Sequence, residues 1–233
     1  MSKKKILFIS NHAAFFVSHR INIFEESKKN NYNFYLIFGR AASSQMENLS
    51  IKKIKKKKII FSKFKYSNNS FSFINDFWSL IKIVAIIRKY KPNIIHSASP
   101  KANIYAGILA KFFYNIGLVI SFSGMGYLYT EKKYSLSLII KKFLFDKLLS
   151  FIFSKKKKKI IVQNNHDYLL LKKKFNLSKK NLIHITGGSG INIKKFSQIK
   201  RKKTKNIVMV SRILKNKDVI EFFKASQLLK LKY

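Results

Sequence analysis

Cysteine is absent from this chain of 233 residues, which excludes disulfide bridges and thiolate zinc sites and is typical of proteins of a reducing cytoplasm. Acidic residues are scarce too, with 9 Asp and Glu against 49 Lys and Arg. They form no Asp-x-Asp pair, and the histidines show no His-x-His or His-Glu-x-x-His spacing, so we expect no metal site. Because no Gly-x-Gly-x-x-Gly follows the first apolar run, we also expect no dinucleotide, and we predict no other cofactor.

Long apolar runs are missing as well. The first apolar stretch has only five residues before Asn11, which is too short for the apolar region of a secretory signal. No window reaches the ~18–20 apolar residues that a membrane-spanning helix needs. We therefore expect a cytoplasmic protein that neither is secreted nor spans a membrane.

Positive charge is what the chain has in excess, with a formal net charge of +40. Such a charge favours a nucleic acid or an anionic membrane surface as a partner. The lysines are spread over every segment rather than clustered beside stacking aromatics, so we expect no nucleic acid. High usage of Lys, Asn, Ile and Phe together is also what an AT-rich coding sequence produces, and this alternative stays open. Hydrophobic residues make up 47%, which predicts a globular fold.

Apolar, strand-like runs alternate with helix-like segments along most of the chain. Continuous runs of Ile, Val, Leu and Phe separated by helices are typical of a parallel sheet buried on both faces. The sequence therefore predicts an α/β fold with a doubly wound, Rossmann-like sheet of about seven strands. Strands are predicted at residues 5–10, 33–38, 58–61, 93–96, 118–122, 160–163 and 182–185, and helices at 17–30, 72–90, 102–115, 135–154 and 167–175.

A run of charge without core-forming residues marks a domain boundary. Residues 198–205 are basic, so we predict a first domain at 1–196 and a linker at 197–205. The segment 206–233 then begins a second, incomplete lobe, with a buried strand at 206–211 and a helix at 219–231.

Polar and glycine-rich segments follow nearly every predicted strand. Ligands of an open parallel sheet bind outside the carboxyl ends of its strands, so these segments predict a cleft for hydroxyl-rich or phosphorylated ligands. They comprise residues 10–12, 97–101, 123–126, 164–166 and 187–190.

Several of these segments keep a characteristic order and spacing. They are residues 15–20, 95–102, 122–130 and 161–164, the turn at 188–192, and Arg212 with Lys217 five residues later. Together they resemble the family 4 glycosyltransferases, two-lobed enzymes of the GT-B fold, and most of all the branch that acts on lipid-diphosphate-linked sugars. The resemblance runs from Lys5 to about Lys230.

The resemblance implies a metal-independent, retaining transfer of sugar from a nucleotide-sugar donor to a polyprenyl-diphosphate-linked acceptor in surface polysaccharide or lipopolysaccharide biosynthesis. Arg212 and Lys217 would be catalytic, holding the donor diphosphate and stabilising the charge of the leaving group. Donor contacts would also come from Gly188, Ser189 and Gly190. Acceptor contacts would come from His12, Ser18, His19, Arg20, Ser99, Lys101, Ser123 and Gly124.

The chain departs from this family in three respects. Ser123 stands where many members carry histidine, and Asn192 stands where Asp is common. The acidic motif that holds the donor sugar would lie beyond Tyr233. We therefore expect the chain to be inactive alone, and a separately encoded donor lobe is one candidate partner. The alternative is a non-catalytic fragment that binds membrane or acceptor.

Other interpretations of these residues remain open at this stage. His12, His19 and Arg20 are equally typical of a solvated sheet edge and a helix cap, and His96 of a core histidine. Trp78 is predicted to pack in the core, and the helix containing it is predicted to turn one apolar stripe toward the sheet, formed by Phe77, Leu80, Ile81, Val84 and Ile87. The helix at 135–154 runs into the lysines at 155–159, which favours either a core helix or peripheral binding at the inner membrane face, where the basic patch at 52–58 would help.

Overall fold

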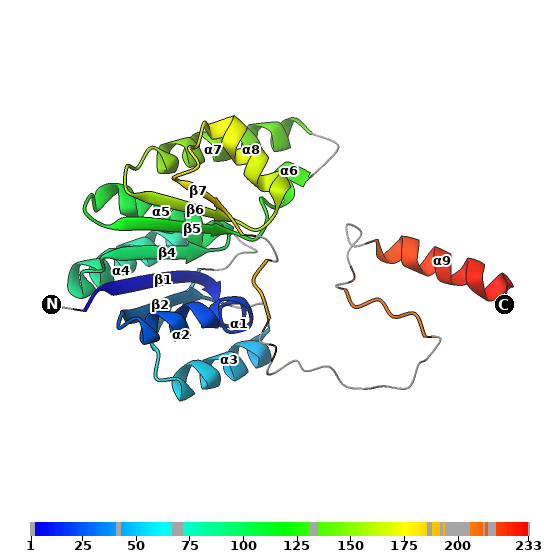
Figure 1. Cartoon of the computed structure of the whole chain (residues 1–233), viewed down its shortest axis with the longest axis horizontal. Coiled ribbons are helices and arrows are strands. Elements are labelled where there is room, and N and C mark those ends of the chain that lie inside the picture. Colours follow the sequence, from blue (N-terminus) through cyan, green and yellow to red (C-terminus); the bar gives the residue numbers. More distant parts are fainter. Residues whose placement is uncertain are drawn as a thin grey trace. The chain divides into compact units, whose positions relative to one another are not determined.

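Parallel strands form the centre of the fold in the computed structural model (Figure 1). The structure describes residues 3–40, 43–66, 72–130, 135–185, 188–191, 193, 206–211, 213 and 218–232. Two compact units are present, Met1–Gly190 and Ile191–Tyr233, and each is considered by itself. The linker predicted at 197–205 lies outside the described residues.

The first unit contains a seven-stranded sheet with the order β3-β2-β1-β4-β5-β6-β7, and every neighbouring pair is parallel. This confirms the predicted parallel α/β architecture. The chain moves outward in one direction from β1 to β3 and then returns to β4 and continues the other way, so the order reverses between β1 and β4. The strands are β1 (Lys5–His12), β2 (Asn33–Gly39), β3 (Ile60–Lys63), β4 (Ile94–Ala98), β5 (Gly117–Phe122), β6 (Lys158–Val162) and β7 (Leu182–His184).

Helices connect successive strands, as parallel pairing demands. Those predicted from apolar spacing are present, whereas a helix at Ser44–Lys56 and a short one at Tyr127–Thr130 were not predicted. The helical segments are α1 (Ala13–Phe15), the π-helix η1 (Phe16–Arg20), α2 (Ile21–Lys29), α3 (Ser44–Lys56), α4 (Phe73–Tyr90), α5 (Pro100–Phe112), α6 (Tyr127–Thr130), α7 (Leu136–Phe153), α8 (Asn165–Phe175) and α9 (Val219–Lys232).

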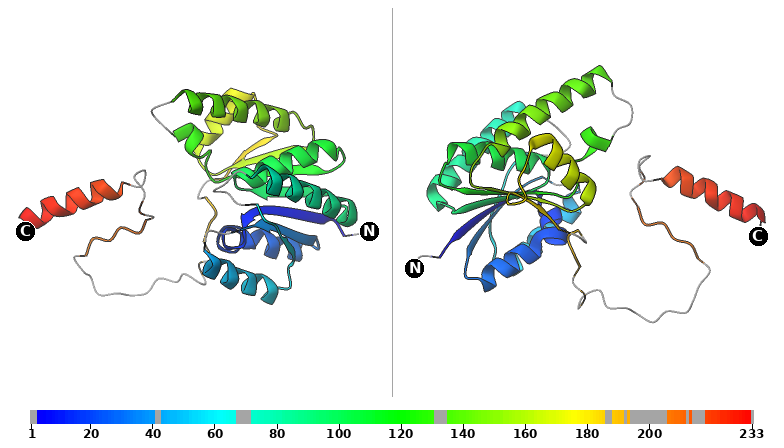
Figure 2. Two further views of the ribbon diagram at one scale, coloured as in Figure 1. Left: turned by 180° about the vertical axis from the view of Figure 1, so that it is seen from behind. Right: turned by 45° about the horizontal axis from the view of Figure 1, so that its top comes forward.

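Two apolar cores lie on opposite faces of the sheet, because successive side chains of a strand point to opposite sides. Leu7 and Ile9 of β1 belong to a core shared with α4, α5, α7 and α8, whereas Phe8 belongs to a core shared with η1, α2 and α3. Viewed from behind, α4 and α5 cross in front of the sheet (Figure 2). Helices therefore cover both faces, which makes the sheet doubly wound.

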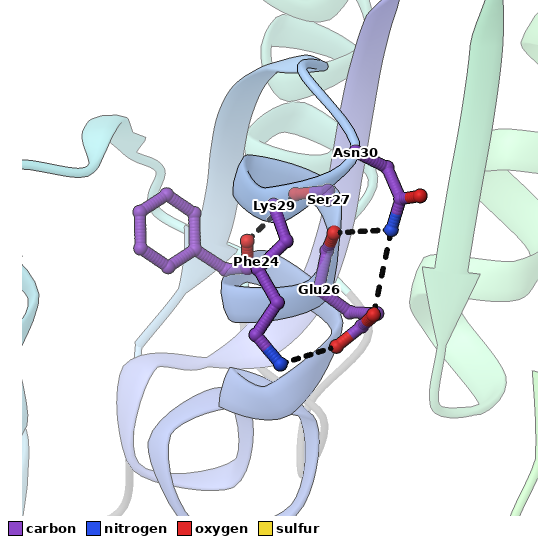
Figure 3. A network of polar contacts seen from close by, with 5 residues as sticks. All are labelled: Phe24, Glu26, Ser27, Lys29 and Asn30. Atoms are coloured by element: carbon purple, nitrogen blue, oxygen red, sulfur yellow. Dashed lines mark hydrogen bonds and ion pairs between the residues drawn. The ribbon is translucent and has the colours of Figure 1, made fainter.

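The end of α2 shows how local polar contacts finish a helix before the next strand (Figure 3). Asn30 Nδ2 donates to the carbonyl oxygen of Glu26 at 2.9 Å, and the Lys29 ammonium pairs with the Glu26 carboxylate at 3.0 Å. Ser27 Oγ donates to the carbonyl oxygen of Phe24 at 2.8 Å. Asn31 then takes a left-handed conformation with φ 62°, which directs the chain into β2.

Two predictions about packing are wrong. Residues 206–211 form no strand, and the side chains of Ile207, Val208 and Val210 are exposed. An isolated strand leaves its backbone groups unpaired, and the described part of this unit has no other strand to pair with. The predicted helix of this second unit is confirmed as α9.

Trp78 lies on the outer face of α4, and its side chain is 56% exposed. The side chains of Phe77 and Ile81 are 60% and 42% exposed. The rest of the predicted stripe is confirmed, because Ile87 lies in the core beside Ile83, with Leu80 and Val84 packed against it.

Candidate active site

The first candidate residue, Arg20, lies at the end of a π-helix. β1 leads directly into α1, where the ring of His12 caps the helix, and the chain then widens into η1 before α2 begins. A π-turn inserts one extra residue into a helix and rotates the side chains around it, and such turns are frequent at functional sites. Arg20, the last residue of η1, is turned inward and is only 4% exposed.

The Arg20 guanidinium joins two loops at the carboxyl edge of the sheet. Its Nη2 donates to Ser123 Oγ at 2.9 Å, in the loop after β5, and its Nη1 donates to Ser189 Oγ at 2.6 Å, in the turn after β7. Ser189 Oγ also accepts a bond from Gln163 Nε2 at 3.3 Å, from the end of β6. The structure thus brings together three residues that the sequence analysis assigned to a site: Arg20, Ser123 and Ser189.

No acid in the described part of the chain matches the charge of Arg20. Among the described residues no carboxylate forms an ion pair with it, and its other contacts are the carbonyl oxygen of His19 at 3.0 Å and the ring of Phe15 at 5.4 Å. Burial lowers the pKa of Arg20, but a guanidinium keeps its proton at neutral pH. A buried cation held by hydroxyls and an aromatic ring is suited to bind an anionic ligand.

His12 has one ring nitrogen fixed by the helix it caps. Its Nδ1 accepts a hydrogen bond from the Phe15 amide at 3.1 Å. Burial lowers the pKa of His12 below 6.5, the charge of Glu47 opposes this shift, and His19 adds to it. The ring is therefore mainly neutral at pH 7 with its proton on Nε2, since Nδ1 is the acceptor. In this state His12 can donate one hydrogen bond from Nε2 to a ligand.

Ser18 and His19 lie on the outer side of the same segment. Ser18 Oγ lies 2.6 Å from the carbonyl oxygen of Ala14 and 2.6 Å from Nδ1 of His19, whose ring stacks on Phe15 at 5.0 Å. Both side chains are exposed. They therefore occupy a solvent-facing position next to the buried Arg20.

Backbone strain marks the end of β4. Ser99 has φ 98° and ψ 149°, a region that costs a residue with a side chain about 1–3 kcal/mol. Its buried hydroxyl has no hydrogen-bond partner among the described residues, and the same is true of Oδ1 of Asn11. Because Ser10 is in register with Ala98, these two polar atoms follow adjacent strands. Buried polar atoms normally have partners, so both are available to a ligand or a water molecule.

Beneath this edge a buried polar network fixes the strands. Asn103 of α5 accepts from Ser97 Oγ at 2.8 Å and donates to the carbonyl oxygen of Ser121 at 3.1 Å, while Ser121 Oγ lies 2.9 Å from Nε2 of His96. Burial, and secondarily the charge of Arg20, lowers the pKa of His96 to about 3. His96 is thus a neutral core residue, which is the structural alternative that the sequence left open.

Comparison with known proteins assigns this lobe to a family. The model of the glycosyl transferase 4-like family matches residues 5–164. The chain belongs to the glycosyl transferase 4-like family. No curated protein sequence matches the chain.

Solved structures share the fold of this glycosyl transferase 4-like chain. A glycosyltransferase from Rickettsia africae ESF-5 is similar at 20% identity with a TM-score of 0.57, over 84% of this chain and 46% of that one. Sucrose-phosphate synthase from Thermosynechococcus elongatus is similar at 13% identity and a TM-score of 0.51, over 82% and 49%. UDP-GlcNAc 2-epimerase from Methanocaldococcus jannaschii is similar at 11% identity and a TM-score of 0.51, over 77% and 45%. The chain spans about half the length of these proteins, and the likeness concerns the fold alone.

The remaining predicted site residues of this family member are placed less centrally. Lys101 is buried and its ammonium pairs with Asp76 at 2.8 Å, so its charge is matched within the protein. Gly124 is half-buried after β5, and Gly188 and Gly190 have φ values of 68° and 69°, which glycine adopts without strain. Arg212, Lys217 and Asn192 lie outside the described residues, so their roles stay predictions.

Sequence reasoning missed three contributors to the site. The Phe15 ring packs against Arg20, Gln163 supports Ser189, and Asp76 neutralises Lys101. Phe15 and Gln163 lie within the segments that carry the family resemblance, so that signal was available for them. Asp76 is far from any such segment, and only folding brings α4 beside α5.

Proposed function

We propose that this chain is the acceptor-binding lobe of a glycosyltransferase that moves a sugar from a nucleotide-sugar donor to a lipid-diphosphate-linked saccharide in surface polysaccharide assembly. The observation that carries the proposal is the buried Arg20, whose guanidinium lies between Ser123 and Ser189 at the carboxyl edge of the sheet. Family membership supports a sugar-transfer role for the whole protein.

The acceptor diphosphate is the ligand that this geometry suits best. Arg20 supplies a cation that no described acid neutralises, and charge-assisted bonds to phosphate are stronger than those to the serine hydroxyls that now hold it. His12 would donate from Nε2, and the free hydroxyl of Ser99 would bond to a sugar or phosphate oxygen. Ser18 and His19 would line the solvent side, and the backbone of Gly124 would allow a close approach.

The donor side of the reaction rests on the glycine turn and on Arg212 and Lys217. We infer that these two cations hold the donor diphosphate and stabilise the leaving group electrostatically, without a metal. Gly188 and Gly190 would let the backbone approach the ligand, with Ser189 between them tied to Arg20. These groups contact a diphosphate only, so we propose that contacts to the donor sugar come from a further lobe, either joined to this one or separately encoded.

Peripheral binding to an anionic membrane completes the proposal. In the described part of the chain, no helix is both long enough and apolar enough to cross a bilayer. The outer face of α4 exposes Phe77 and Trp78 with Ile74 and Ile81 one turn to either side, and α7 exposes a similar apolar stripe. Both helices pack on the same face of the sheet. Exposed lysines flank the stripes and would interact with anionic headgroups at about 1 kcal/mol each. The α7 stripe consists of Leu136, Ile139, Ile140, Phe143 and Leu144.

Binding of a soluble prenyl-diphosphate-linked saccharide to the full chain tests the acceptor site. The expected result is saturable binding that Arg20→Lys weakens tenfold or more, because lysine lacks the two-pronged donor geometry of arginine. Arg88→Lys, on the exposed surface of α4, is the matched control and should change the Kd less than twofold. Equal affinities for the two variants would contradict an acceptor role for Arg20.

An assay of sugar transfer from a nucleotide donor distinguishes a transferase from a non-catalytic fragment. We expect the 233-residue chain to release no sugar from a nucleotide donor by itself, and we expect activity when a donor lobe is supplied. Under those conditions Arg212→Ala should lower kcat by roughly a hundredfold. Turnover by the chain alone would refute the need for a second lobe, and binding of acceptor without turnover under both conditions would favour the non-catalytic alternative.

Vesicle sedimentation tests the membrane proposal. The chain should sediment with anionic vesicles and not with neutral ones, and less so at high salt, because the Debye length falls from about 10 Å at 0.1 M to about 3 Å at 1 M. Changing Phe77 and Trp78 to Ser should weaken this binding about tenfold, whereas Met46→Ser with Leu49→Ser, exposed on α3, should have little effect. Equal binding to neutral vesicles would contradict the proposal.

A further inference from the structure

A cavity of about 210 Å³ lies at the amino ends of β5 and β6, next to the ends of α5 and α7. It opens at the edge of the sheet opposite to Arg20. β5 has 6 residues, so the two edges are separated by roughly 20 Å at about 3.3 Å per residue. The cavity is lined by Lys111, Tyr114, Ser154, Lys155, Lys156 and Lys157.

Four of the six lining residues are lysines and none is acidic. The side chain of Lys155 is buried, and its ammonium lies 3.2 Å from the carbonyl oxygen of Tyr114 and 3.4 Å from that of Phe113. The ammonium of Lys111 lies 2.6 Å from Ser154 Oγ and over the ring of Phe151 at 4.8 Å. These partners are neutral, so the lining itself provides no charge to balance the lysines.

Burial and neighbouring lysines destabilise the charged forms of two lysines at the cavity, Lys155 and Lys158. Burial lowers the pKa of Lys155, and the charges of Lys111 and Lys157 lower it further. The pKa of the adjacent Lys158 is likewise lowered by burial and by Lys111. A bound anion would relieve this repulsion, and the cavity therefore favours a negatively charged occupant.

We propose that this cavity binds a phosphate group, either as free phosphate or as the headgroup of an anionic lipid. The volume of about 210 Å³ is below the roughly 300–1,000 Å³ of pockets for larger organic ligands, so it suits a compact anion. Lysine ammonium groups bind phosphate as point charges, and the hydroxyl of Tyr114 adds a donor, whereas Ser154 Oγ already donates to the carbonyl oxygen of Phe151 at 2.7 Å. The site shares no residue with the acceptor site at the other edge, and it stands without the proposed function.

The position of the cavity allows either source of phosphate. Phe112 and Phe151 beside it are 77% and 47% exposed, so a lipid chain attached to a bound headgroup would meet apolar side chains. A free phosphate would need only the lysines and the Tyr114 hydroxyl. The shared chemistry is the phosphate group, and two separate binding measurements distinguish its sources.

Calorimetric titration of the full chain with inorganic pyrophosphate, at fixed ionic strength, is the first measurement. Lys156→Gln with Lys157→Gln removes two exposed lining charges, and Lys172→Gln with Lys173→Gln, exposed on α8, removes the same charge elsewhere. The first pair should weaken binding at one site tenfold or more, and the control pair less than twofold. Thermal unfolding of both variants should match the parent chain because all four side chains are exposed.

Sedimentation with vesicles of phosphatidic acid in phosphatidylcholine is the second measurement, with the same two variants. Selective loss of pyrophosphate binding alone supports the cavity as a site for free phosphate, and selective loss of vesicle binding supports it as a headgroup site. Equal losses in both variants in both measurements, or no binding to either probe, would overturn the proposal. The affinity for the prenyl-diphosphate acceptor should be the same in the parent chain and in the cavity variant, so failure of one proposal is distinguishable from failure of the other.

Discussion

Arg20 and Ser189 are separated by 169 positions in the sequence, yet the Arg20 guanidinium donates to the Ser189 hydroxyl at 2.6 Å. This bond ties the segment after the first strand to the glycine turn after the last one. Because Ser123 accepts from the same guanidinium, one buried side chain fixes two loops of the candidate site. The position of the glycine turn therefore depends on Arg20.

Replacing the Arg20 guanidinium, which donates to both Ser123 and Ser189, should destabilise the lobe. Arg20→Lys keeps the charge but cannot reach both serine hydroxyls, and lost hydrogen bonds to a charged group cost about 1.5–3 kcal/mol. The free energy of unfolding in urea should fall by about this amount. Arg88→Lys should change it by less than about 0.5 kcal/mol, because Arg88 is exposed. Equal effects would show that the bridge between the loops contributes little.

Ser99 should respond to substitution through its backbone as well as its hydroxyl. Glycine tolerates φ 98°, so Ser99→Gly should relieve strain and raise the unfolding free energy by about 1 kcal/mol, after the entropic cost of glycine. Ser99→Ala removes the same hydroxyl but keeps the strain, so its unfolding free energy should be about 1 kcal/mol lower than that of Ser99→Gly. Thermal unfolding checks both. Acceptor affinity should fall in both variants if the hydroxyl contacts the ligand, and an equal stability gain in the two would contradict the strain argument.

His96 should make the fold sensitive to acid. The pKa of His96 is about 3 in the folded chain against about 6.5 when unfolded, so below pH 6.5 the unfolded state binds a proton that the folded state does not. Stability should therefore fall by ~1.4 kcal/mol per pH unit between pH 6.5 and 3, with no contribution above pH 6.5.

Urea unfolding of the parent chain and of His96→Gln at several pH values checks this dependence. The difference between their unfolding free energies should fall by ~2 kcal/mol from pH 6.5 to pH 5, while contributions from carboxylates cancel. A difference that does not change with pH would mean that His96 gains its proton in the folded protein at an ordinary pH.

Gly107 should tolerate no side chain, because α7 crosses α5 at that point. A Cβ built on Gly107 would lie 2.5 Å from Cγ2 of Ile152. Gly107→Ala should therefore destabilise the protein by about 1–2 kcal/mol, an overpacking cost partly offset by the better helix propensity of alanine. Gly124→Ala, which has no atom within 4 Å of the new Cβ, is the control for unfolding measurements. Ile152→Ala, which removes all three atoms that the new Cβ would approach, should destabilise Gly107→Ala less than it destabilises the parent chain, and a stabilised Gly107→Ala would contradict the close approach.

Much of the fold follows from apolar runs alone. The strands β1, β2 and β5 contain runs of Ile, Leu, Phe and Val, and a strand buried on both faces requires this composition wherever the rest of the chain goes. α3 was not predicted because it buries Glu47, Ser50 and Ile54 rather than a regular apolar stripe. The wrong prediction for Trp78 has the opposite cause, since α4 is apolar on both sides and its sequence does not specify which side meets the sheet.

The sequence by itself determined the seven strands of the sheet, most of the helices between them, the parallel α/β class and the identity of the polar residues after each strand, because periodicity and turn residues act over a few positions. Only the tertiary structure decided which of those polar residues meet. The contacts of Arg20 with Ser123 and Ser189, the pairing of Lys101 with Asp76 and the cluster of lysines around one cavity all join segments distant in the chain. Such contacts depend on burial and on the crossing of helices over the sheet, which no local pattern encodes.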